Sequence, residues 1–340
     1  MKKLSIVVPV YKVEKYIHAC LESVFRQGIS DEDFEVIIVN DGTPDRSIDL
    51  IEDIIKEHKN IILINQHNQG LSVSRNNGIG IANGRYIIFL DSDDLLADGS
   101  LNPLIEIASQ TEVDLITADF KRMDDEEINN NKDALISQPN SIIEKTTGRS
   151  LFMEDFNPKE CYVWRVIYRT EFLRTNNIYF VPGICYEDMP FIHECYLKAN
   201  RCLKTHYLLY LYRVGHSSIT SSINKKTGKD FGTAISKTWE LRDIEGLPSP
   251  IKEKLHDNIF AAFSVLTYGI THDMQSLSDM NEVMDHLKGI APDLKFTHGF
   301  KQQFVNFMYH KMAYTYILIR MLVVKAKKSK FFNLLNKIGR

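Results

Sequence analysis

The sequence predicts an α/β fold with a mainly parallel sheet flanked by helices, followed by a helical C-terminal region. Between residues 3 and 90, short apolar runs rich in β-branched residues alternate with segments whose apolar residues recur at helical spacing. The strand-like runs are almost entirely apolar, which is typical of strands covered on both faces in a parallel sheet. From residue 229 onwards the pattern is mostly helical, with breaks at 246–250 and 289–292.

Four strands and three helices are predicted in the first part of the chain. The strands are the apolar runs at 3–10, 34–39, 61–65 and 86–90. Helices are predicted over 14–27, 47–58 and 70–82, and the first two show helical spacing through Ile17, Leu21, Val24 and Phe25 and through Ile48, Ile51, Ile54 and Ile55. Each predicted helix connects two strands, as the helices of parallel sheets do.

The next part of the chain mixes both kinds of element. We expect helices over 101–109, 148–156, 171–176 and 187–198, strands over 114–120 and 207–212, and a strand or a helix start over 163–168. Residues 124–140 are polar and predict a mobile loop or hairpin.

The composition describes a soluble globular protein. Of its 340 residues, 44% are apolar and 25% are charged. No long apolar stretch follows Met1, so we expect no signal peptide. The five cysteines are scattered and form no CxxC pair, which favours reduced thiols and a cytoplasmic location over a disulfide or zinc framework.

Charge is distributed unevenly along the chain. No acidic residue follows Asp293, while ten of the 41 lysines and arginines do. A basic tail can meet nucleic acid, an anionic membrane or an acidic partner. We expect no nucleic acid binding, because no recognition motif is present.

The C-terminal part combines apolar and basic residues. The apolar stretch 304–324 is interrupted by His310, Lys311 and Arg320, so it falls short of the roughly 20 apolar residues that a membrane span needs. Residues 325–340 predict an interfacial amphipathic helix that contacts an anionic membrane. The alternatives are a helix packed on the rest of the protein or a self-association element of a homo-oligomer.

The most informative stretch is the acidic run Asp91-Ser92-Asp93-Asp94, which follows the strand predicted at 86–90. Neighbouring carboxylates repel one another and are costly to desolvate, so we expect a cation near them, such as a divalent metal carrying phosphates. The alternative is a solvated acidic turn that caps the next helix. Tyr11 and Asp41 also follow strands, and ligands of such sheets bind at the carboxyl ends of the strands. This convergence favours a binding site.

Taken in order, the motifs of the first half resemble those of the family 2 glycosyltransferases. The matching stretches are SIVVPVY at 5–11, CLESV at 20–24, VIIVNDGTPD at 36–45, NQGLSVSRNNG at 68–78 and GRYIIFLDSDD at 84–94. The match is dense from Lys3 to Leu96 and weaker to about Ser222. The chain departs from the family pattern at Lys12, where Asn is usual, and at Pro44, where Thr is usual.

The resemblance implies a GT-A (Rossmann-like) fold with a mixed, mainly parallel sheet. It implies a catalytic domain over 1–222, divided into a nucleotide-binding half (1–96) and an acceptor half (97–222), before a helical region at 229–340. The implied activity is an inverting hexosyl- or N-acetylhexosaminyltransferase that moves a sugar from a UDP-sugar to a hydroxyl of a glycan or a lipid-linked glycan acceptor. Such an enzyme would belong to bacterial surface polysaccharide biosynthesis and work at the inner face of the cell membrane.

The resemblance also implies roles for individual residues. The predicted metal ligands, for Mn²⁺ or Mg²⁺, are Asp93 and His216. The predicted nucleotide-sugar contacts are Pro9, Tyr11, Glu14, Asp41, Arg75, Asp91, Ser92 and Arg213.

Several of these residues have a structural alternative. Asp41 is also a turn former, Glu14 also a first-turn helix residue, and Arg75 also a surface ion-pair partner. A lone loop histidine such as His216 is often only solvated. Asp94 is assigned either to a helix cap or to support of the site.

The predicted base lies at Glu187-Asp188, which resembles the Glu-Asp motif of the family. A sugar hydroxyl that attacks an anomeric carbon must lose a proton near the transition state. We expect Asp188 to take it and Glu187 to orient the acceptor, unless both acids only stabilise a helix N-terminus.

Two rival functions remain open at this point. A sugar nucleotidyltransferase would carry a Gly-rich phosphate loop, which residues 9–14 lack. A non-catalytic scaffold of the same fold would recruit partners to a membrane through its tail. The chain retains all the acidic residues of the motifs, which argues against a loss of catalytic activity.

Overall fold

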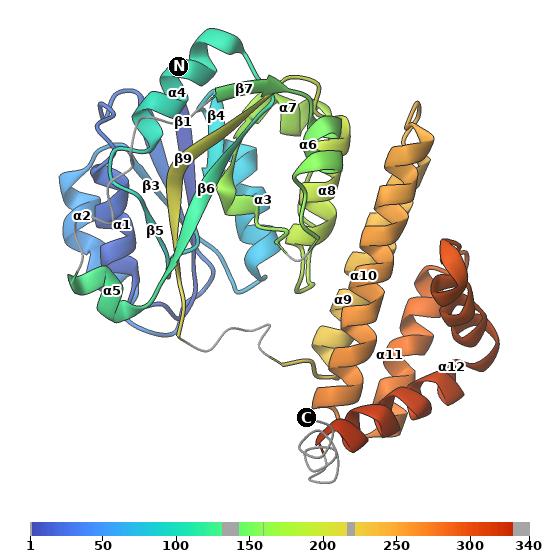
Figure 1. Ribbon diagram of the computed structural model, residues 1–340. Helices are drawn as coiled ribbons and strands as arrows, with labels where there is room; N and C mark the ends of the chain where they lie inside the picture. The colour runs from blue at the N-terminus through green and yellow to red at the C-terminus, as the bar shows by residue number, and fades with distance from the viewer. Residues whose placement is uncertain (1, 131–142, 159, 216–221, 329–340) are drawn as a thin grey trace. The chain divides into compact units, whose positions relative to one another are not determined.

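The computed structural model describes residues 2–130, 143–158, 160–215 and 222–328 (Figure 1). The chain forms two compact units. The first comprises Met1–Gly183 and Phe191–His216, and the second comprises Ile184–Pro190 and Ser217–Arg340. The second unit thus includes a short segment that lies inside the range 97–222 predicted for the acceptor half.

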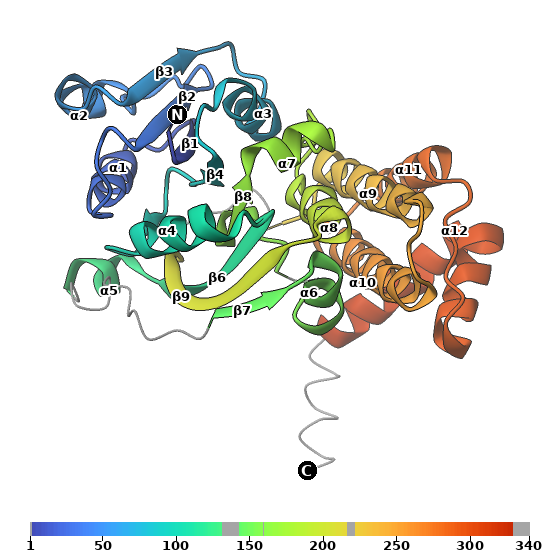
Figure 2. The same cartoon turned by 90° about the horizontal axis from the view of Figure 1, so that it is seen from above.

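The first unit is built on one mixed sheet, which confirms the predicted fold class. Its strands within the described residues are β1 (Leu4–Val10), β2 (Phe34–Asn40), β3 (Ile61–Asn65), β4 (Tyr86–Phe89), β5 (Leu95–Leu96), β6 (Leu115–Met123), β7 (Ile143–Thr146), β8 (Val166–Arg169) and β9 (Cys202–Arg213). Their order is β3-β2-β1-β4-β8-β6-β9-β5, and β7 pairs with β9 (Figure 2). The pairs β3/β2, β2/β1, β1/β4 and β6/β9 are parallel, while β8, β5 and β7 pair antiparallel.

Helices connect and cover these strands. In chain order they are α1 (Ile17–Phe25), η1 (Asp49–Ile51), α2 (Glu52–Glu57), α3 (Leu71–Ile81), α4 (Leu101–Thr111), α5 (Asp125–Asn130), α6 (Gly148–Glu154), η3 (Val163–Arg165), α7 (Thr170–Thr175) and α8 (Asp188–Lys198).

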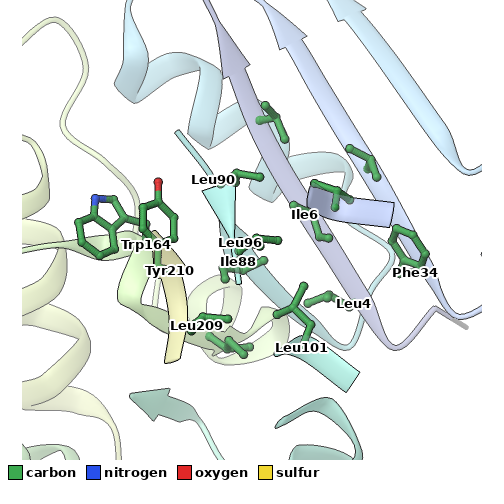
Figure 3. Close-up of a cluster of buried hydrophobic side chains, with 14 of the residues drawn as sticks. Leu4, Ile6, Phe34, Ile88, Leu90, Leu96, Leu101, Trp164, Leu209 and Tyr210 are labelled. Carbon is green, nitrogen blue, oxygen red and sulfur yellow. The ribbon is translucent and has the colours of Figure 1, made fainter. Parts of the chain in front are cut away.

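The two faces of β1 meet different helices. Leu4, Ile6, Val8 and Val10 belong to the main hydrophobic core, together with buried residues of α1 and α4 (Figure 3). On the other face, a Cβ added to Gly78 of α3 would lie 2.4 Å from a methyl carbon of Val7. Glycine therefore allows α3 to approach the sheet, and burial on both faces explains why this strand is apolar apart from Ser5.

The first helix is shorter than predicted. We expected it over 14–27, but α1 begins at Ile17. The carbonyl of Val13 accepts hydrogen bonds from the amides of Tyr16 and Ile17, so a turn precedes the helix. The amides of residues 12–14 are hydrogen bonded to side chains after β2, which draws this stretch away from helical geometry.

The expectation of a loop or hairpin over 124–140 is wrong at its start, because Asp125–Asn130 forms α5. The Asp124 carboxylate accepts from the Glu127 amide, and the Glu127 carboxylate accepts from the Asp124 amide. This reciprocal pair is a capping box, and its Asp-x-x-Glu spacing is visible in the sequence. Residues 131–142 lie outside the described part of the chain.

The second unit is helical, as predicted. Its described helices are α9 (Lys225–Glu240), η4 (Leu241–Asp243), α10 (Ser249–Asp273), α11 (Leu277–Ile290) and α12 (Gly299–Lys328). α10 packs against α9 and α12, and α11 packs against the same two helices. α12 is bent at Met312, whose backbone is non-helical (Figure 1). Within the described residues, no helix has the length and apolar character needed to cross a membrane.

Candidate functional site

Loops at the carboxyl ends of β1 and β2 are joined by hydrogen bonds. The Lys12 amide donates to Thr43 Oγ1 (2.8 Å) and the Val13 amide donates to Ser47 Oγ (3.0 Å). In the other direction, the Arg46 amide donates to a Glu14 carboxylate oxygen (3.1 Å). Glu14 therefore does not act as a first-turn residue of α1, because it helps to hold these two loops together.

Asp45 accepts hydrogen bonds from residues of both loops. One of its oxygens accepts from the hydroxyls of Thr43 and Ser47 (2.6 Å each) and from the Ser47 amide, and the other accepts from the Glu14 amide. Partial burial raises the pKa of Asp45, but the hydrogen bonds from Ser47 and Thr43 outweigh it and hold the pKa below its usual value.

Asp45→Asn is expected to lower the free energy of unfolding by about 1–2 kcal/mol at pH 7, because an amide cannot accept from all four donors. A group whose folded pKa is depressed contributes stability above its unfolded pKa, and this contribution is lost as the pH falls through the folded value. The difference between the two proteins should therefore shrink below about pH 4. Urea unfolding at pH 7 and pH 3.5 measures this, with exposed Asp49→Asn as the control. An equal effect of both substitutions would contradict the role of Asp45.

Lys12 has a left-handed backbone conformation, with φ of 57°. This conformation is unfavourable for residues with a long side chain and is better tolerated by Asn or Gly. The departure from the usual Asn of the family at this position therefore strains the loop. Its side chain is exposed, and its Nζ lies 5.1 Å from the centre of the Tyr11 ring.

Lys12→Gly is expected to raise the free energy of unfolding by about 0.5–1 kcal/mol, because glycine adopts positive φ without a steric penalty. Thermal or urea unfolding measures the change. Lys15→Gly is the matched control, since Lys15 is exposed in the same loop and has no positive φ. If Lys15→Gly also stabilised the protein, or if Lys12→Gly destabilised it, the backbone of Lys12 would not be strained.

Asp41 is 3% exposed and organises the loop before α3. Its carboxylate accepts from Gln66 Nε2 and from the amides of Gln69 and Gly70, each at 2.8 Å. These donors occupy three of the four lone pairs of the carboxylate. The predicted contact with a uracil N3–H therefore has one lone pair left to use, and this role stays a prediction.

Arg75 and Asp91 form an ion pair in which the arginine is buried and the aspartate is half-buried. Arg75 Nη2 lies 2.7 Å from Asp91 Oδ1, and the Arg75 side chain is 1% exposed. Its guanidinium lies over the ring of Phe180 (5.1 Å). The alternative of a surface ion pair for Arg75 is thus wrong, because the Arg75 side chain is buried, and from α3 it fixes the half-buried Asp91 that follows β4.

Both the backbone and the ring of Phe180 are fixed by contacts. The Asn76 side chain donates to the Phe180 carbonyl (2.8 Å) and accepts from its amide (2.9 Å). The ring stacks on Phe191 in the first turn of α8, with centroids 3.9 Å apart and an interplanar angle of 4°. Phe191 and Phe180 both meet Phe89, the last residue of β4. These contacts connect α3, the end of β4 and the start of α8 within the first unit.

Asp94 attaches the acidic loop, residues 91–94, to β9. It is 1% exposed and accepts from the Tyr210 hydroxyl (2.8 Å) and the Arg213 amide (2.7 Å), both on β9. Burial, followed by the charges of Asp93 and Asp91, raises the pKa of Asp94 well above its usual range. The helix-cap assignment of Asp94 is wrong, because β5 follows directly and α4 begins only at Leu101.

Arg213 joins the acidic loop to α5. Its Nε donates to the Asp93 carbonyl (2.7 Å), and its Nη1 forms an ion pair with Asp125. The guanidinium lies over the Tyr16 ring (4.8 Å), and the side chain is 6% exposed. Arg213 thus lies beside the acidic loop and is already bonded within the protein, and its contact with the donor stays a prediction. His216 lies outside the described residues.

The remaining predicted contacts occupy the same edge of the first unit. Pro9 is buried near the end of β1, and Tyr11 directly after the strand is 41% exposed. Ser92 is buried within the acidic loop, while Asp91 and Asp93 are half-buried. An exposed aromatic ring and two accessible carboxylates therefore lie at neighbouring strand ends.

Glu187 and Asp188 lie in the segment Ile184–Pro190 of the second unit. Asp188 is the first residue of α8 and is half-buried, and Glu187 is 7% exposed. Tyr186 before them has φ of 67° and stacks on Phe231 (4.2 Å). Burial, followed by the charges of Cys185, Asp273 and Asp230, raises the pKa of Tyr186 to about 12. The position of the two acids relative to the acidic loop stays a prediction.

The acidic loop fits a divalent cation by its chemistry. Within the described residues, no group of three or more His, Cys, Asp or Glu side chains is arranged to hold a metal ion. Mg²⁺ and Mn²⁺, however, are commonly held by one or two carboxylates together with substrate phosphates. The half-buried Asp93 carboxylate, beside Asp91 and at a strand end, is suited to such a shared site.

Several residues that shape the site escaped the sequence reasoning. Tyr210 donates to Asp94, and Asp125 pairs with Arg213. Both pairs join elements that are far apart in the sequence, and nothing local identifies them as partners. Asp45 could have been found, because Thr-Pro-Asp-Arg-Ser carries hydroxyls on both sides of one carboxylate.

Comparison with known proteins gives a consistent result. The family "Glycosyl transferase family 2" matches residues 5–173. The chain is 31% identical over 238 residues to the putative glycosyltransferase EpsH of Bacillus subtilis (strain 168), covering 69% of this chain and 67% of EpsH. It is 36% identical over 219 residues to the uncharacterized glycosyltransferase EpsJ of the same strain, covering 64% of this chain and 62% of EpsJ. The match therefore spans less than two thirds of the length of EpsJ.

Solved structures share the fold. The crystal structure of S. aureus TarS 1–349 in complex with UDP superposes with a TM-score of 0.71 at 20% identity, covering 96% of this chain and 91% of that one. The complex of TarS 1–349 with UDP-GlcNAc gives a TM-score of 0.66 at 23% identity, with coverages of 85% and 80%. The mannosyltransferase PcManGT from Pyrobaculum calidifontis, in complex with GDP-Man and Mn²⁺, gives a TM-score of 0.54 at 13% identity, with coverages of 96% and 86%.

Proposed function

Because this chain belongs to glycosyltransferase family 2, with the GT-A fold, we propose that it transfers a sugar from a UDP-sugar to a hydroxyl of a glycan. The observation that carries the proposal is the acidic loop at the end of β4, held by Arg75 and β9 beside the loops of β1 and β2. TarS, which shares this fold, has been crystallised with UDP and with UDP-GlcNAc. These complexes support a UDP-sugar as the donor class.

The proposed reaction is a single displacement. Asp188 accepts the proton of the acceptor hydroxyl as its oxygen attacks the anomeric carbon, and the bond between that carbon and the UDP oxygen breaks. One base opposite one leaving group gives inversion at the anomeric carbon. Glu187 orients the acceptor, and Arg75 keeps the Asp91 carboxylate toward the nucleotide.

A divalent cation, Mn²⁺ or Mg²⁺, would be held by Asp93 and by the donor phosphates, with His216 as a further ligand. Such an ion supplies charge neutralisation for the departing diphosphate. Tyr11 offers a flat contact for the uracil base, because its exposed ring follows β1 at the same edge.

The acceptor is proposed to be a growing surface polysaccharide, free or on a lipid carrier. The curated relatives include the minor teichoic acid biosynthesis protein GgaB of Bacillus subtilis (strain 168) and the poly(ribitol-phosphate) beta-glucosyltransferase of Bacillus spizizenii. A cytoplasmic location, contact with an anionic membrane and self-association remain proposals.

Calorimetry with UDP, in the presence and absence of Mn²⁺, tests the donor assignment. UDP binding that is strengthened by Mn²⁺ is expected, followed by hydrolysis or transfer of at least one UDP-sugar in a donor screen. A lack of UDP binding with Mn²⁺ present would favour the non-catalytic scaffold. Production of a UDP-sugar from UTP and a sugar phosphate would favour the nucleotidyltransferase.

A further inference from the structure

α12 carries large apolar side chains on both of its faces. One face is buried through Val305, Met308, Tyr309, Tyr316 and Ile317. Phe263 of α10 contacts the rings of Tyr309 (5.2 Å) and Tyr316 (6.4 Å) there. This packed face accounts for the position of α12 in the second unit.

The opposite face of α12 is open to solvent. Its exposed side chains include Phe300 (86% exposed), Phe304 (52%), Phe307 (54%), Ile319 (48%) and Leu322 (55%). A surface helix of a globular protein ordinarily turns its large apolar side chains toward the core and its polar side chains toward water. Exposed apolar patches of this kind mark contact surfaces. We therefore expect a binding partner to cover the open face of α12.

The exposed residues form stripes along the helix. Before the bend at Met312, Phe300, Phe304, Phe307 and Lys311 follow one another at intervals of three and four residues, and so share one side of the helix. After the bend, Leu318, Leu322 and Lys325 repeat the same spacing. Each half of α12 thus presents an apolar stripe that ends in a lysine.

α12 carries basic side chains and no acidic one. Lys311 and Lys325 end the two exposed stripes, and Lys301 is also exposed, with its Nζ 5.9 Å from the centre of the Phe260 ring of α10. Two acids of neighbouring helices accept hydrogen bonds from other side chains of α12, since Asp257 accepts from Gln302 and Asp285 accepts from the Tyr314 hydroxyl. A binding partner that combines an apolar interior with a negatively charged surface would complement the open face of α12.

We propose that the open face of α12 binds an anionic lipid surface, with the helix lying in the plane of the interface. Aromatic side chains enter the headgroup region, and lysines contact lipid phosphates. A second copy of the chain is the less suitable occupant, because pairing equivalent faces would bring the lysines of both copies together. The helix lies on the membrane and does not span it, in agreement with the absence of a spanning helix among the described residues.

This inference rests on the proposed contact with a membrane and not on sugar transfer. Failure of lipid binding would leave donor binding and catalysis untouched, and a protein without transferase activity would still bind vesicles. The two proposals are therefore tested by separate readouts.

Co-sedimentation of the full chain with vesicles tests the proposal. Vesicles of phosphatidylcholine mixed with phosphatidylglycerol are compared with vesicles of phosphatidylcholine alone. The variant Phe300→Ser/Phe304→Ser/Phe307→Ser is expected to bind the anionic vesicles at least tenfold more weakly than the natural chain. Lys301→Gln/Lys311→Gln/Lys325→Gln is expected to lose about fivefold in binding per lysine on anionic vesicles, and little on neutral ones.

The matched control is Leu50→Ser/Ile81→Ser/Met153→Ser, which removes three exposed apolar side chains from the first unit. It should bind vesicles as the natural chain does, and all variants should keep the same unfolding temperature. Absence of binding to anionic vesicles, or equal binding by the phenylalanine variant, would overturn the proposal. So would a dimer in light scattering that the phenylalanine variant converts to a monomer without any lipid binding.

Discussion

Asp93→Ala is expected to lower kcat for sugar transfer by about a thousandfold or more. The reason is the charge that develops on the departing UDP, whose neutralisation by a bound cation contributes several kcal/mol, and a thousandfold corresponds to about 4 kcal/mol. Asp91 and Asp93 are the half-buried carboxylates of the acidic loop, Asp91 is paired with Arg75, and Asp94 is buried against β9. Loss of Asp93 should also remove the strengthening of UDP binding by Mn²⁺ in calorimetry.

The control for this substitution is Asp98→Ala. Asp98 lies a few residues further along the same segment, where it forms an ion pair with Arg26 near the surface. Its removal should leave kcat and the effect of Mn²⁺ within a fewfold of the natural protein, because exposed ion pairs contribute little. If Asp93→Ala retained transfer and Mn²⁺-dependent UDP binding to the same degree, the metal assignment would be wrong.

Asp188→Asn is expected to lower kcat by about 10²–10⁴-fold, with a small change in KM for the donor. An amide cannot take a proton from the acceptor hydroxyl, and a positioned general base contributes a factor of this size. The substitution keeps the shape of the side chain at the start of α8. The pH dependence of kcat should also lose its acidic limb, because the group that must be deprotonated is gone.

A structural role of Asp188 predicts a different result. If its charge only stabilised the N-terminus of α8, the loss would be about 1 kcal/mol or less of stability, without a large effect on kcat. Glu171→Gln, in the first turn of α7, removes an acid from a comparable position and measures that effect. Similar kcat values for both variants, with similar unfolding temperatures, would exclude Asp188 as the base.

The sequence was sufficient where local pattern determines structure. The parallel strands β1, β2 and β4 are buried on both faces, and the edge strand β3 is half-buried. An apolar run bounded by polar loops identifies such strands without knowledge of their neighbours. The position of Tyr11, Asp41 and Asp91 at one edge followed from the same alternation, since parallel strands share a carboxyl edge.

The sequence was insufficient where partners are distant or contacts are shared. β5 has two residues, Leu95 and Leu96, and is defined by pairing with β9, so its own composition does not identify it. Asp94 resembles a helix cap in sequence, but Tyr210 and Arg213 determine its environment. The same limit applies to Asp41. The sequence did not show that three donors from the loop before α3 already bond its carboxylate.

The bonds between the acidic loop and β9 have a consequence for the synthesis of the protein. Nearly all the predicted nucleotide contacts precede residue 97, yet Asp94 receives its hydrogen bonds from Tyr210 and Arg213, and the Asp93 carbonyl receives one from Arg213. Contacts of such long sequence separation form late, because the entropy of closing the loop must be overcome first. A growing chain that has emerged only as far as β4 holds the residues of the site without the strand that fixes them. The donor half therefore gains its final arrangement only after β9 has left the ribosome.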